Sequence, residues 1–547
     1  MIQSHPIEDL SLDDKFVNNG VGMDDDLMIL NFFESSTFSP PFTTTHDHDS
    51  LETSSTNFAP SAMSNEFIDF DNFPFHVNES SSVLGLEDLD PNFNIELDEM
   101  RDWLENGDHR ESDDSYYHQL SIYQEVTDTS MDVTSIIQPI LNLPTQDMEI
   151  NNELCTSHLA KAYGEAMANE QRELAEVIVR RINEKVSPVG EITERLLYHS
   201  FRPLNNEAND NYLKQESCKV FDAAFEAFYR VFPNGMFAHF TANSAILEAI
   251  PHDAGVLHIV DFDMGEGIQW ASMIVALAQQ QKLLQQFGII SQQITLKLTS
   301  IKWKNGDCIC GQAHPHLRFE ETKKQLICYA NCHDLKLKVE EMELQDLVSE
   351  IKKTTRRGRR REWLAFNCMW ALPHMRRRRR RRHVMEFLKV AKDFLPNSDS
   401  NKTTNDKNNG MITFGDGDTW EKIEDYSCFG SFFDSYQEHY GALLESMEWN
   451  FHKRLVEARI AMECLFVAPF ASCVALLEKW KEVKEVCEFE AGFGLKGVRL
   501  SSESLMEAKV MAREGESLYT VRIEGENANE MVLEWGRTPL VRVSAWR

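Results

Sequence analysis

The sequence predicts an α/β protein whose core is a Rossmann-like, methyltransferase-like parallel sheet. An apolar segment, Val256–Asp261, is typical of a buried central strand and ends in an acidic residue. A turn with two glycines, Gly265 and Gly267, follows this strand and leads into a helix, which is how the ligand pocket of such folds begins. Beyond this unit, predicted strands and helices alternate, as they do in α/β cores.

Helices precede this core. The spacing predicts a helix in which Leu174, Val177, Ile178, Arg181 and Ile182 share one face. Because helices come first and strands and helices alternate later, we expect a helical cap over about 151–235 on an α/β core over about 236–547. The next two helices are expected at Ile192–Phe201 and Lys219–Phe232.

The later elements are predicted from the same periodicities. The sequence ends in a region that is typical of antiparallel strands. The further strands expected are Ile294–Ile301, Leu335–Val339, Trp363–Cys368 and Met411–Phe414. The further helices expected are Glu320–Asn331, Phe429–Glu448 and Arg454–Val467.

Residues 1–150 form a separate acidic region. They hold 32 acidic and three basic residues, a net charge of −29, whereas the other 397 residues hold 56 acidic and 52 basic, a net charge of −4. Such a segment cannot bury enough apolar surface to offset its ordering entropy, so we expect a disordered tail. Bulky apolar residues stand among carboxylates in Met23–Ser35 and Leu86–Asp108. This composition favours an activation segment that folds against a partner, with a solubilising tail as the alternative.

The absence of a recognisable targeting signal and the distribution of cysteines favour an intracellular compartment. No N-terminal stretch joins a basic start to an apolar core, so we expect no secretory signal. We find no run of about 18 apolar residues and expect no membrane-spanning helix. The 11 cysteines are scattered through a long chain, which fits a reducing intracellular compartment better than a disulfide scaffold.

The glycine turn raises the question of cofactor chemistry. A nucleotide cofactor site needs three glycines, so that the backbone approaches the cofactor closely, and a carboxylate after the second strand to bind the ribose hydroxyls. Here Asp263 stands at the first glycine position, and the second strand ends in Ile301-Lys302-Trp303. We therefore expect a structural turn, no cofactor and no catalytic residues. The alternative is an S-adenosylmethionine-dependent small-molecule methyltransferase.

Cysteines and histidines cluster in the middle of the chain, which suggests a zinc site because thiolates and imidazoles are its usual ligands. Their spacing matches no common zinc module, and the later cysteines fall in a helix expected to be core, where free cysteine behaves as a small apolar residue. We therefore expect no metal. The residues are Cys308, Cys310, His314, His316, Cys328, Cys332 and His333.

Two basic runs interrupt the nearly neutral core region. The first begins with Lys352 and Lys353, and the second is an unbroken run of seven arginines that we expect to lie exposed, since seven consecutive guanidinium groups cannot be buried. Three interpretations stay open: a nuclear import signal, phosphate contacts with nucleic acid, and a solvated insertion without a partner. The arginines of these runs are Arg356, Arg357, Arg359, Arg360 and Arg361, then Arg376, Arg377, Arg378, Arg379, Arg380, Arg381 and Arg382.

Several ordered segments together resemble the plant GRAS family of transcriptional regulators, over about 154–547. The family's signature Val-His-Ile-Ile-Asp reads Leu257-His258-Ile259-Val260-Asp261 here, and HFTAN (His239–Asn243), GIQW (Gly267–Trp270) and FNCMWALPH (Phe366–His374) also match. Within the family, the similarity is greatest to the nodulation-signalling and scarecrow-like members. The C-terminal block of the family matches at Trp480, Trp535, Ser544, Ala545 and Trp546.

This resemblance implies a nuclear transcriptional regulator or co-regulator, in plant hormone or symbiosis signalling, and no enzyme. It implies that the helical cap pairs with another GRAS protein or a DNA-binding transcription factor, so that DNA is contacted indirectly. We expect an import receptor to bind the basic runs, and no membrane partner. In the signature itself, Ile259 and Val260 are expected in the core, with His258 and Asp261 bonded to backbone groups or to each other.

Overall fold

The computed structural model describes most of the chain from residue 152 onward. The acidic region 1–150, with its two candidate activation segments, lies outside the described residues, so the expectations for it stay predictions. The described segments are 152–202, 217–219, 221–288, 293–303, 307–308, 315–356, 362–375, 377–378, 381–395, 410–417, 426–451, 455–485 and 495–547.

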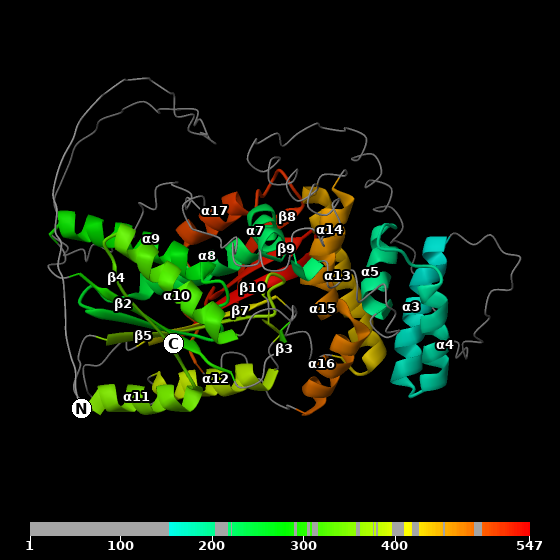
Figure 1. The fold of residues 1–547 in the computed structure, drawn as a ribbon, viewed down its shortest axis with the longest axis horizontal. Coiled ribbons are helices and arrows are strands. Elements are labelled where there is room, and N and C mark those ends of the chain that lie inside the picture. The colour runs from blue at the N-terminus through cyan, green and yellow to red at the C-terminus, as the bar shows by residue number, and fades with distance from the viewer. Residues whose placement is uncertain are drawn as a thin grey trace, which may run out of the picture. The chain divides into compact units, whose positions relative to one another are not determined.

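The core is an eight-stranded mixed sheet (Figure 1). Its strands lie in the order β4-β2-β1-β5-β7-β10-β9-β8. The first five are parallel, and the last three continue the sheet in antiparallel pairs, which confirms the predicted α/β class. The strands are β1 (Val256–Asp261), β2 (Thr295–Ile301), β4 (Lys336–Met342), β5 (Glu362–Trp370), β7 (Gly410–Asp416), β8 (Tyr519–Glu524), β9 (Glu530–Trp535) and β10 (Thr538–Trp546).

The strand order defines where a ligand crevice would lie. β1 sits between β2 and β5, and the chain reverses its direction of travel across the sheet at this point. In open α/β sheets, ligands bind outside the carboxyl ends of the strands at such a reversal. The carboxyl ends of β1 and β5 therefore mark the place to look for a functional site.

Helices cover both faces of the sheet. Three of them, α8, α9 and α10, lie on one face, and α11 and α12 lie on the other (Figure 1). The buried apolar side chains form two clusters, one on each side. A parallel strand buried on both faces reads as a continuous apolar run, which explains the sequence of β1. The helices are α8 (Pro233–Ala249), α9 (Ile268–Gln286), α10 (Pro315–Cys332), α11 (Leu344–Arg356) and α12 (Arg381–Phe394).

The N-terminal helices pack beside the sheet rather than on it. α3 (Asn152–Ala168), α4 (Arg172–Asn183) and α5 (Ile192–Phe201) contact one another, and α3 and α5 pack against α13 (Phe429–Asn450) (Figure 1). α7 (Phe221–Val231) then packs on α8. Helices from the second half of the chain therefore complete the packing of the first three helices.

The buried face of α4 differs from the predicted one. Its buried residues are Ala175, Ile178, Val179 and Ile182, and Val177 is 43% exposed. The predicted face is wrong at Val177 and Arg181, which are exposed. The buried face of the helix is shifted by about one residue, so that it includes the small residue Ala175 and Val179. The outward face of α4 consequently carries an apolar side chain among charged ones.

A long apolar helical stretch, Val456–Glu482, follows α13. By length and composition alone it could cross a membrane, contrary to the expectation that no segment is apolar enough, but 72% of its most apolar window is buried inside the protein. It is interrupted by a π-helical turn and ends against other helices, as a core element does. Its parts are α14 (Val456–Met462), η6 (Glu463–Val467), α15 (Ala468–Ala471) and α16 (Cys473–Glu485).

The two edges of the sheet are protected from further pairing. At the β8 edge, the Val521 N–H donates to the Glu514 carboxylate at 2.9 Å and the Tyr519 N–H donates to Ser517 Oγ at 3.2 Å. At the other edge, the outermost strand β4 carries several charged side chains. Backbone N–H groups that are already bonded and charged side chains on an edge strand both disfavour pairing with a strand of another molecule.

Candidate functional site: the carboxyl edge of the sheet and the helices beside it

The signature strand occupies the centre of the core. Leu257 and Ile259 belong to the apolar cluster on one face of the sheet, and Val260 belongs to the cluster on the other face. All three are fully buried. The structure therefore confirms that Ile259 and Val260 are core residues.

His258 connects the central strand to both neighbours. Its Nδ1 lies 2.9 Å from a carboxylate oxygen of Glu362, the first residue of β5, and its Nε2 lies 2.9 Å from Thr299 Oγ1 on β2. Burial lowers the pKa of His258, while the hydrogen bond to Glu362 opposes that change. Both ring nitrogens are engaged in holding three strands in register.

Asp261 ends the same strand and is buried. Its two carboxylate oxygens accept hydrogen bonds from Trp270 Nε1 and Asn367 Nδ2, both at 2.9 Å. Burial raises the pKa of Asp261 to about 7, although these hydrogen bonds act in the opposite direction. The carboxyl group thus joins β1 to the start of α9 and to β5. Trp270 is fully buried between the helix and the sheet.

A buried amide network continues from Asp261. Gln269 and Asn367 exchange hydrogen bonds of 3.1 and 3.2 Å, and Gln269 also donates to Asn243 Oδ1 on α8 at 3.2 Å. Thr413 on β7 donates to Asn367 at 2.9 Å. These groups satisfy one another in the core, where an unpaired amide would be costly.

The glycine turn is covered by the chain's own side chains. Gly265 and Gly267 have positive φ angles of 55° and 77°, which glycine adopts without strain. Between them, Glu266 accepts three hydrogen bonds of 2.6 to 3.0 Å from Arg318 of α10. A side chain added at Gly267 would lie 2.7 Å from a methyl group of Thr322. The close approach that a phosphate would need is therefore already taken by α10.

The end of β2 is also closed. Trp303 donates its indole N–H to the Phe262 carbonyl at 2.8 Å and packs against the Phe262 ring. Its neighbour Lys302 lies 3.9 Å from Glu341. The position where a nucleotide cofactor would meet a ribose-binding carboxylate is thus held by a lysine and a tryptophan, as the sequence indicates.

The cavity that remains at this crevice is small. Its volume is about 70 Å³, and Met264, Gln269, Phe319 and Met369 are among the residues that line it. Pockets for drug-sized ligands occupy roughly 300–1,000 Å³. The cavity among the described residues is smaller than these pockets.

Two histidines that the sequence analysis did not single out meet in the wall of this cavity. The ring centroids of His239 and His374 are 5.1 Å apart, and Tyr229 hydrogen-bonds His239 Nδ1 at 2.8 Å. Burial lowers the pKa of both histidines, that of His374 to about 3. Both rings are therefore neutral at physiological pH. Their membership of the HFTAN and FNCMWALPH segments was the available signal.

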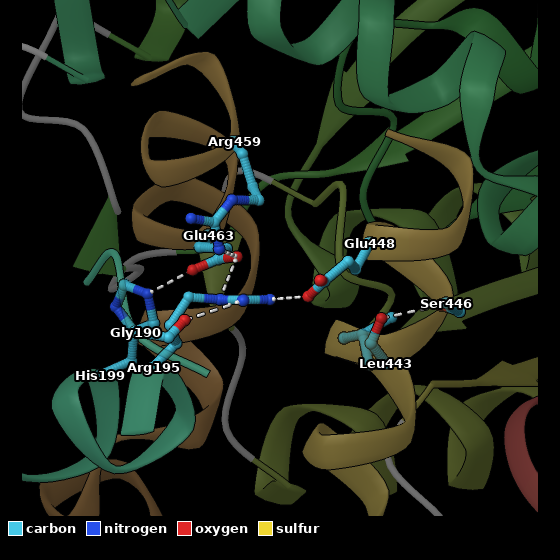
Figure 2. A network of polar contacts seen from close by, with 8 residues as sticks. All are labelled: Gly190, Arg195, His199, Leu443, Ser446, Glu448, Arg459 and Glu463. Atoms are coloured by element: carbon cyan, nitrogen blue, oxygen red, sulfur yellow. Dashed lines mark hydrogen bonds and ion pairs between the residues drawn. The ribbon is translucent and has the colours of Figure 1, made fainter. Parts of the chain in front are cut away.

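A buried cluster of charges joins the N-terminal helices to the second half of the chain (Figure 2). Arg195 of α5 donates to Glu463 at 3.2 Å and to Glu448 at 2.7 Å. His199 and Arg459 also contact the Glu463 carboxylate, at 3.0 and 3.1 Å. These partners lower the pKa of Glu463 despite its burial. Glu463 opens the π-helical turn η6, a type of irregularity that is frequent at functional sites.

The five C-terminal motif residues lie on three elements, α16, β9 and β10. Trp480 of α16 packs against the rings of Phe429 and Phe432. Trp535 of β9 lies against Tyr519, with its indole N–H 3.3 Å from Glu445. The remaining three residues, Ser544, Ala545 and Trp546, pair with β7 in the last strand, where the Trp546 N–H donates to Ser544 Oγ at 2.9 Å.

The two basic runs lie at opposite ends of β5. The first begins with Lys352 and Lys353, which are exposed in the last turns of α11, and precedes the amino end of the strand; the second follows its carboxyl end. The arginines whose side chains lie outside the described residues are Arg356, Arg357, Arg359, Arg360, Arg361, Arg376, Arg377, Arg378, Arg379 and Arg380.

The expectation of a wholly exposed second run is wrong at Arg381. This residue opens α12 with a side chain only 2% exposed, and its backbone N–H donates to Glu482 at 3.1 Å. It lies on the inward stripe of α12, three and seven residues before the buried Val384 and Leu388. Arg382, the next residue, is exposed.

The cysteine expectations need two corrections. Cys328 and Cys332 are exposed rather than core, because α10 turns neighbouring positions inward. Cys218 is disulfide-bonded, contrary to the expectation of reduced cysteines throughout. Within the described segments, no group of three or more candidate ligands is placed to hold a metal ion. The side chains of Cys308, Cys310, His314 and His316 lie outside them, so the absence of zinc stays a prediction.

Comparison with known proteins agrees with the motifs. Residues 157–547 match the GRAS domain family. The chain is 27% identical over 414 residues to Protein Nodulation Signaling Pathway 2 of Lotus japonicus, covering 71% of this chain and 75% of that protein. It is 26% identical over 408 residues to Scarecrow-like protein 26 of Arabidopsis thaliana, covering 71% and 77%. The crystal structure of SCL7 from Oryza sativa aligns with a TM-score of 0.48 at 20% identity, covering 72% of this chain and 99% of that one.

The matched region begins within α3 and includes every motif described above except the acidic tail. The signature strand, the buried amide network and the C-terminal strand thus all belong to one family domain. The chain is a member of the GRAS domain family of plant transcriptional regulators.

Proposed function

We propose that this protein is a nuclear transcriptional regulator or co-regulator that pairs with another GRAS protein or with a DNA-binding transcription factor, and that the partner recruits it to promoters. Its similarity to two proteins named for nodulation signalling supports a role in plant symbiosis or hormone signalling. In this proposal, residues 1–150 serve as the activation segment and 151–547 as the GRAS domain.

The closed crevice is the observation that supports this function best. Arg318 and Glu266 pair at the glycine turn, and Trp303 occupies the end of β2. An α/β core that keeps its sheet but fills its cofactor position with its own side chains serves as a scaffold. The methyltransferase alternative would need this space.

The helical cap, about 151–235, is the proposed pairing surface. α4 buries one face against its neighbours and presents Val177 on the other, among Glu173, Arg180 and Arg181. In this proposal, Val177 and the charged side chains around it form part of the contact with the partner. The buried charges around Arg195 hold α5 in a defined position against the second half of the chain (Figure 2). Because α3 and α4 pack on α5, they are positioned with it.

The test is co-purification of the full chain with a tagged GRAS protein of the scarecrow-like group. Val177→Asp should lower the affinity by tenfold or more. Val474→Asp, an equally exposed valine on α16, is the matched control and should leave pairing unchanged. Equal pairing by both variants would remove α4 from the interface.

Titration of the same purified chain with S-adenosylmethionine tests the alternative. We expect no binding up to millimolar cofactor, because the cavity is small and the second strand is followed by Lys302 and Trp303. Micromolar binding would replace the regulatory proposal with an enzymatic one.

A further inference from the structure

A tight surface turn lies between α4 and α5. Its four residues are Ser187, Pro188, Val189 and Gly190, and the Gly190 N–H donates to the Ser187 carbonyl at 3.3 Å. Serine at the first position, proline at the second and glycine at the fourth are favoured in a type I β-turn. Ser187 and Pro188 are half-buried and Val189 is 63% exposed, so the turn faces solvent.

Ser187 has the features of a phosphorylation acceptor. Its Oγ accepts a hydrogen bond from the Val189 N–H at 3.3 Å and makes no other within the described segments. The residue that follows it is a proline, which has no backbone N–H. Proline-directed kinases select a serine before such a residue, because the kinase then has no N–H of the substrate to satisfy at that position. The turn therefore presents a hydroxyl in the sequence context that these kinases recognise.

The turn is attached to the buried charges that hold α5. The Gly190 carbonyl accepts a hydrogen bond from Arg195 Nη1 at 3.2 Å, and the same guanidinium group donates to Glu463 (Figure 2). The Glu194 carboxylate lies against Gly190, where a side chain added to the glycine would overlap it. A negative charge therefore already lies beside the turn.

Further negative charge at this place would be repelled. From residue 184 to residue 194 the chain carries three glutamates, Glu184, Glu191 and Glu194, against one basic residue, Lys185. A phosphoserine carries a charge of about −1.5 to −2 at pH 7. On Ser187 the phosphate would share one tight turn with the group that Glu194 contacts. Repulsion between the two anions favours opening of the turn, which frees α4 from its fixed position beside α5.

We propose that a proline-directed kinase phosphorylates Ser187, and that the phosphate loosens this turn and weakens pairing through α4. The effect on pairing rests on the proposed function, whereas the modification and the loosening do not. The kinase transfers the γ-phosphoryl group of MgATP: a bond forms between Ser187 Oγ and the γ-phosphorus, and the bond from that phosphorus to the β–γ bridging oxygen breaks. ADP leaves, and the hydroxyl proton passes to the general base of the kinase.

The first experiment treats the full chain with a purified proline-directed kinase and MgATP, and locates phosphate by mass spectrometry. Ser187 should be phosphorylated, and Pro188→Ala should slow this reaction by about tenfold or more. Thr538-Pro539 is the internal control and should stay unmodified, because Thr538 lies in the β9–β10 hairpin, paired with Trp535. An unmodified Ser187 with a kinase that is active on a Ser-Pro peptide, or equal phosphate on Thr538, would overturn the assignment.

Hydrogen exchange tests the loosening without any partner. In the phosphorylated chain, the amides of residues 184–195 should exchange about tenfold faster than in the unmodified chain, while those of β1 should not change. Glu194→Gln removes one of the repelling charges and should reduce the difference. Unchanged exchange in a chain that carries the phosphate would refute the loosening.

Co-purification with the tagged GRAS protein tests the consequence for pairing. The phosphorylated natural chain should bind about tenfold more weakly than the unmodified chain. Kinase-treated Ser187→Ala should bind as the unmodified chain does. If the unmodified chain pairs and the phosphate on Ser187 leaves pairing unchanged, the regulation is wrong. If the unmodified chain does not pair at all, the proposed function fails, and the first two experiments still decide the modification and the loosening.

Discussion

Arg318 donates three hydrogen bonds of 2.6 to 3.0 Å to the Glu266 carboxylate. Glu266 lies in the turn where a nucleotide-binding protein of this fold would hold its cofactor. Arg318 also reaches Asp222 of α7 at 3.1 Å. One side chain therefore connects the glycine turn, α10 and α7. The crevice at the carboxyl edge is closed by an interaction that also holds these elements together.

Replacing Arg318 by alanine should lower the free energy of unfolding by roughly 1–3 kcal/mol, the range for hydrogen bonds to charged groups. Two carboxylates would lose their partner in a partly buried position. Lys323→Ala is the control, because the ion pair of Lys323 joins it to the exposed Glu320 on the same helix, and it should cost less than about 0.5 kcal/mol. Urea denaturation measures both. Equal costs would show that the Arg318 contacts are not structural.

Glu463→Gln should lower the free energy of unfolding by more than Arg318→Ala does. It removes the carboxylate that Arg195, His199 and Arg459 share, and leaves buried positive charge uncompensated, at a cost of roughly 3–5 kcal/mol. The exposed pair Arg181–Glu184 provides the control variant Glu184→Gln, which should change stability little. Thermal unfolding of both variants is the measurement. A loss below about 1 kcal/mol for Glu463→Gln would contradict the role given to this cluster.

Asp261 makes a specific contribution to the pH dependence of stability. Its pKa is about 7 in the folded protein and 3.8 as a free side chain, so between these values the folded state keeps a proton that the unfolded state has released. The contribution of Asp261 therefore makes stability fall as the pH rises from about 4 to 7. Asp261→Asn removes this contribution, and its stability should fall less over the same interval. Parallel curves of urea midpoint against pH for the two proteins would refute the raised pKa.

Nuclear import should depend on the other arginines of the second run and not on Arg381. A fluorescent fusion in which Arg376–Arg380 and Arg382 are replaced by glutamine should shift towards the cytoplasm. Arg381 is left in place because its buried position in α12 would confuse folding with import. Lys352→Gln/Lys353→Gln tests the other run separately. Unchanged nuclear accumulation of both variants would point to import together with a partner.

The elements that could be predicted from sequence are those defined by a local pattern. Val256–Asp261 and Ile192–Phe201 coincide with β1 and α5, because each is bounded by a change in apolar periodicity that the chain carries within a few residues. The family motifs likewise located the central strand and the last strand. What a motif residue contacts was not predictable to the same degree, because those contacts depend on packing.

The contacts that escaped prediction join residues far apart in the chain. Arg195 and Glu463 are 268 positions apart, and only the presence of charges within apolar stretches hinted that each needs a buried partner. Arg381 illustrates the reverse case. Seven identical residues suggested one environment, whereas the period of α12 turned one of them inward beside Val384 and Leu388.

DNA binding by the purified full chain, in a salt series, with and without a GRAS partner, tests the central claim most directly. The account predicts that the chain alone binds DNA weakly, and that this binding disappears with rising salt and with replacement of Arg376–Arg380 and Arg382, as nonspecific phosphate contacts do. Sequence-specific binding should appear only with the partner. Tight binding of one DNA sequence by the chain alone, persisting at physiological salt, would show a protein that finds its promoters unaided and would contradict the account.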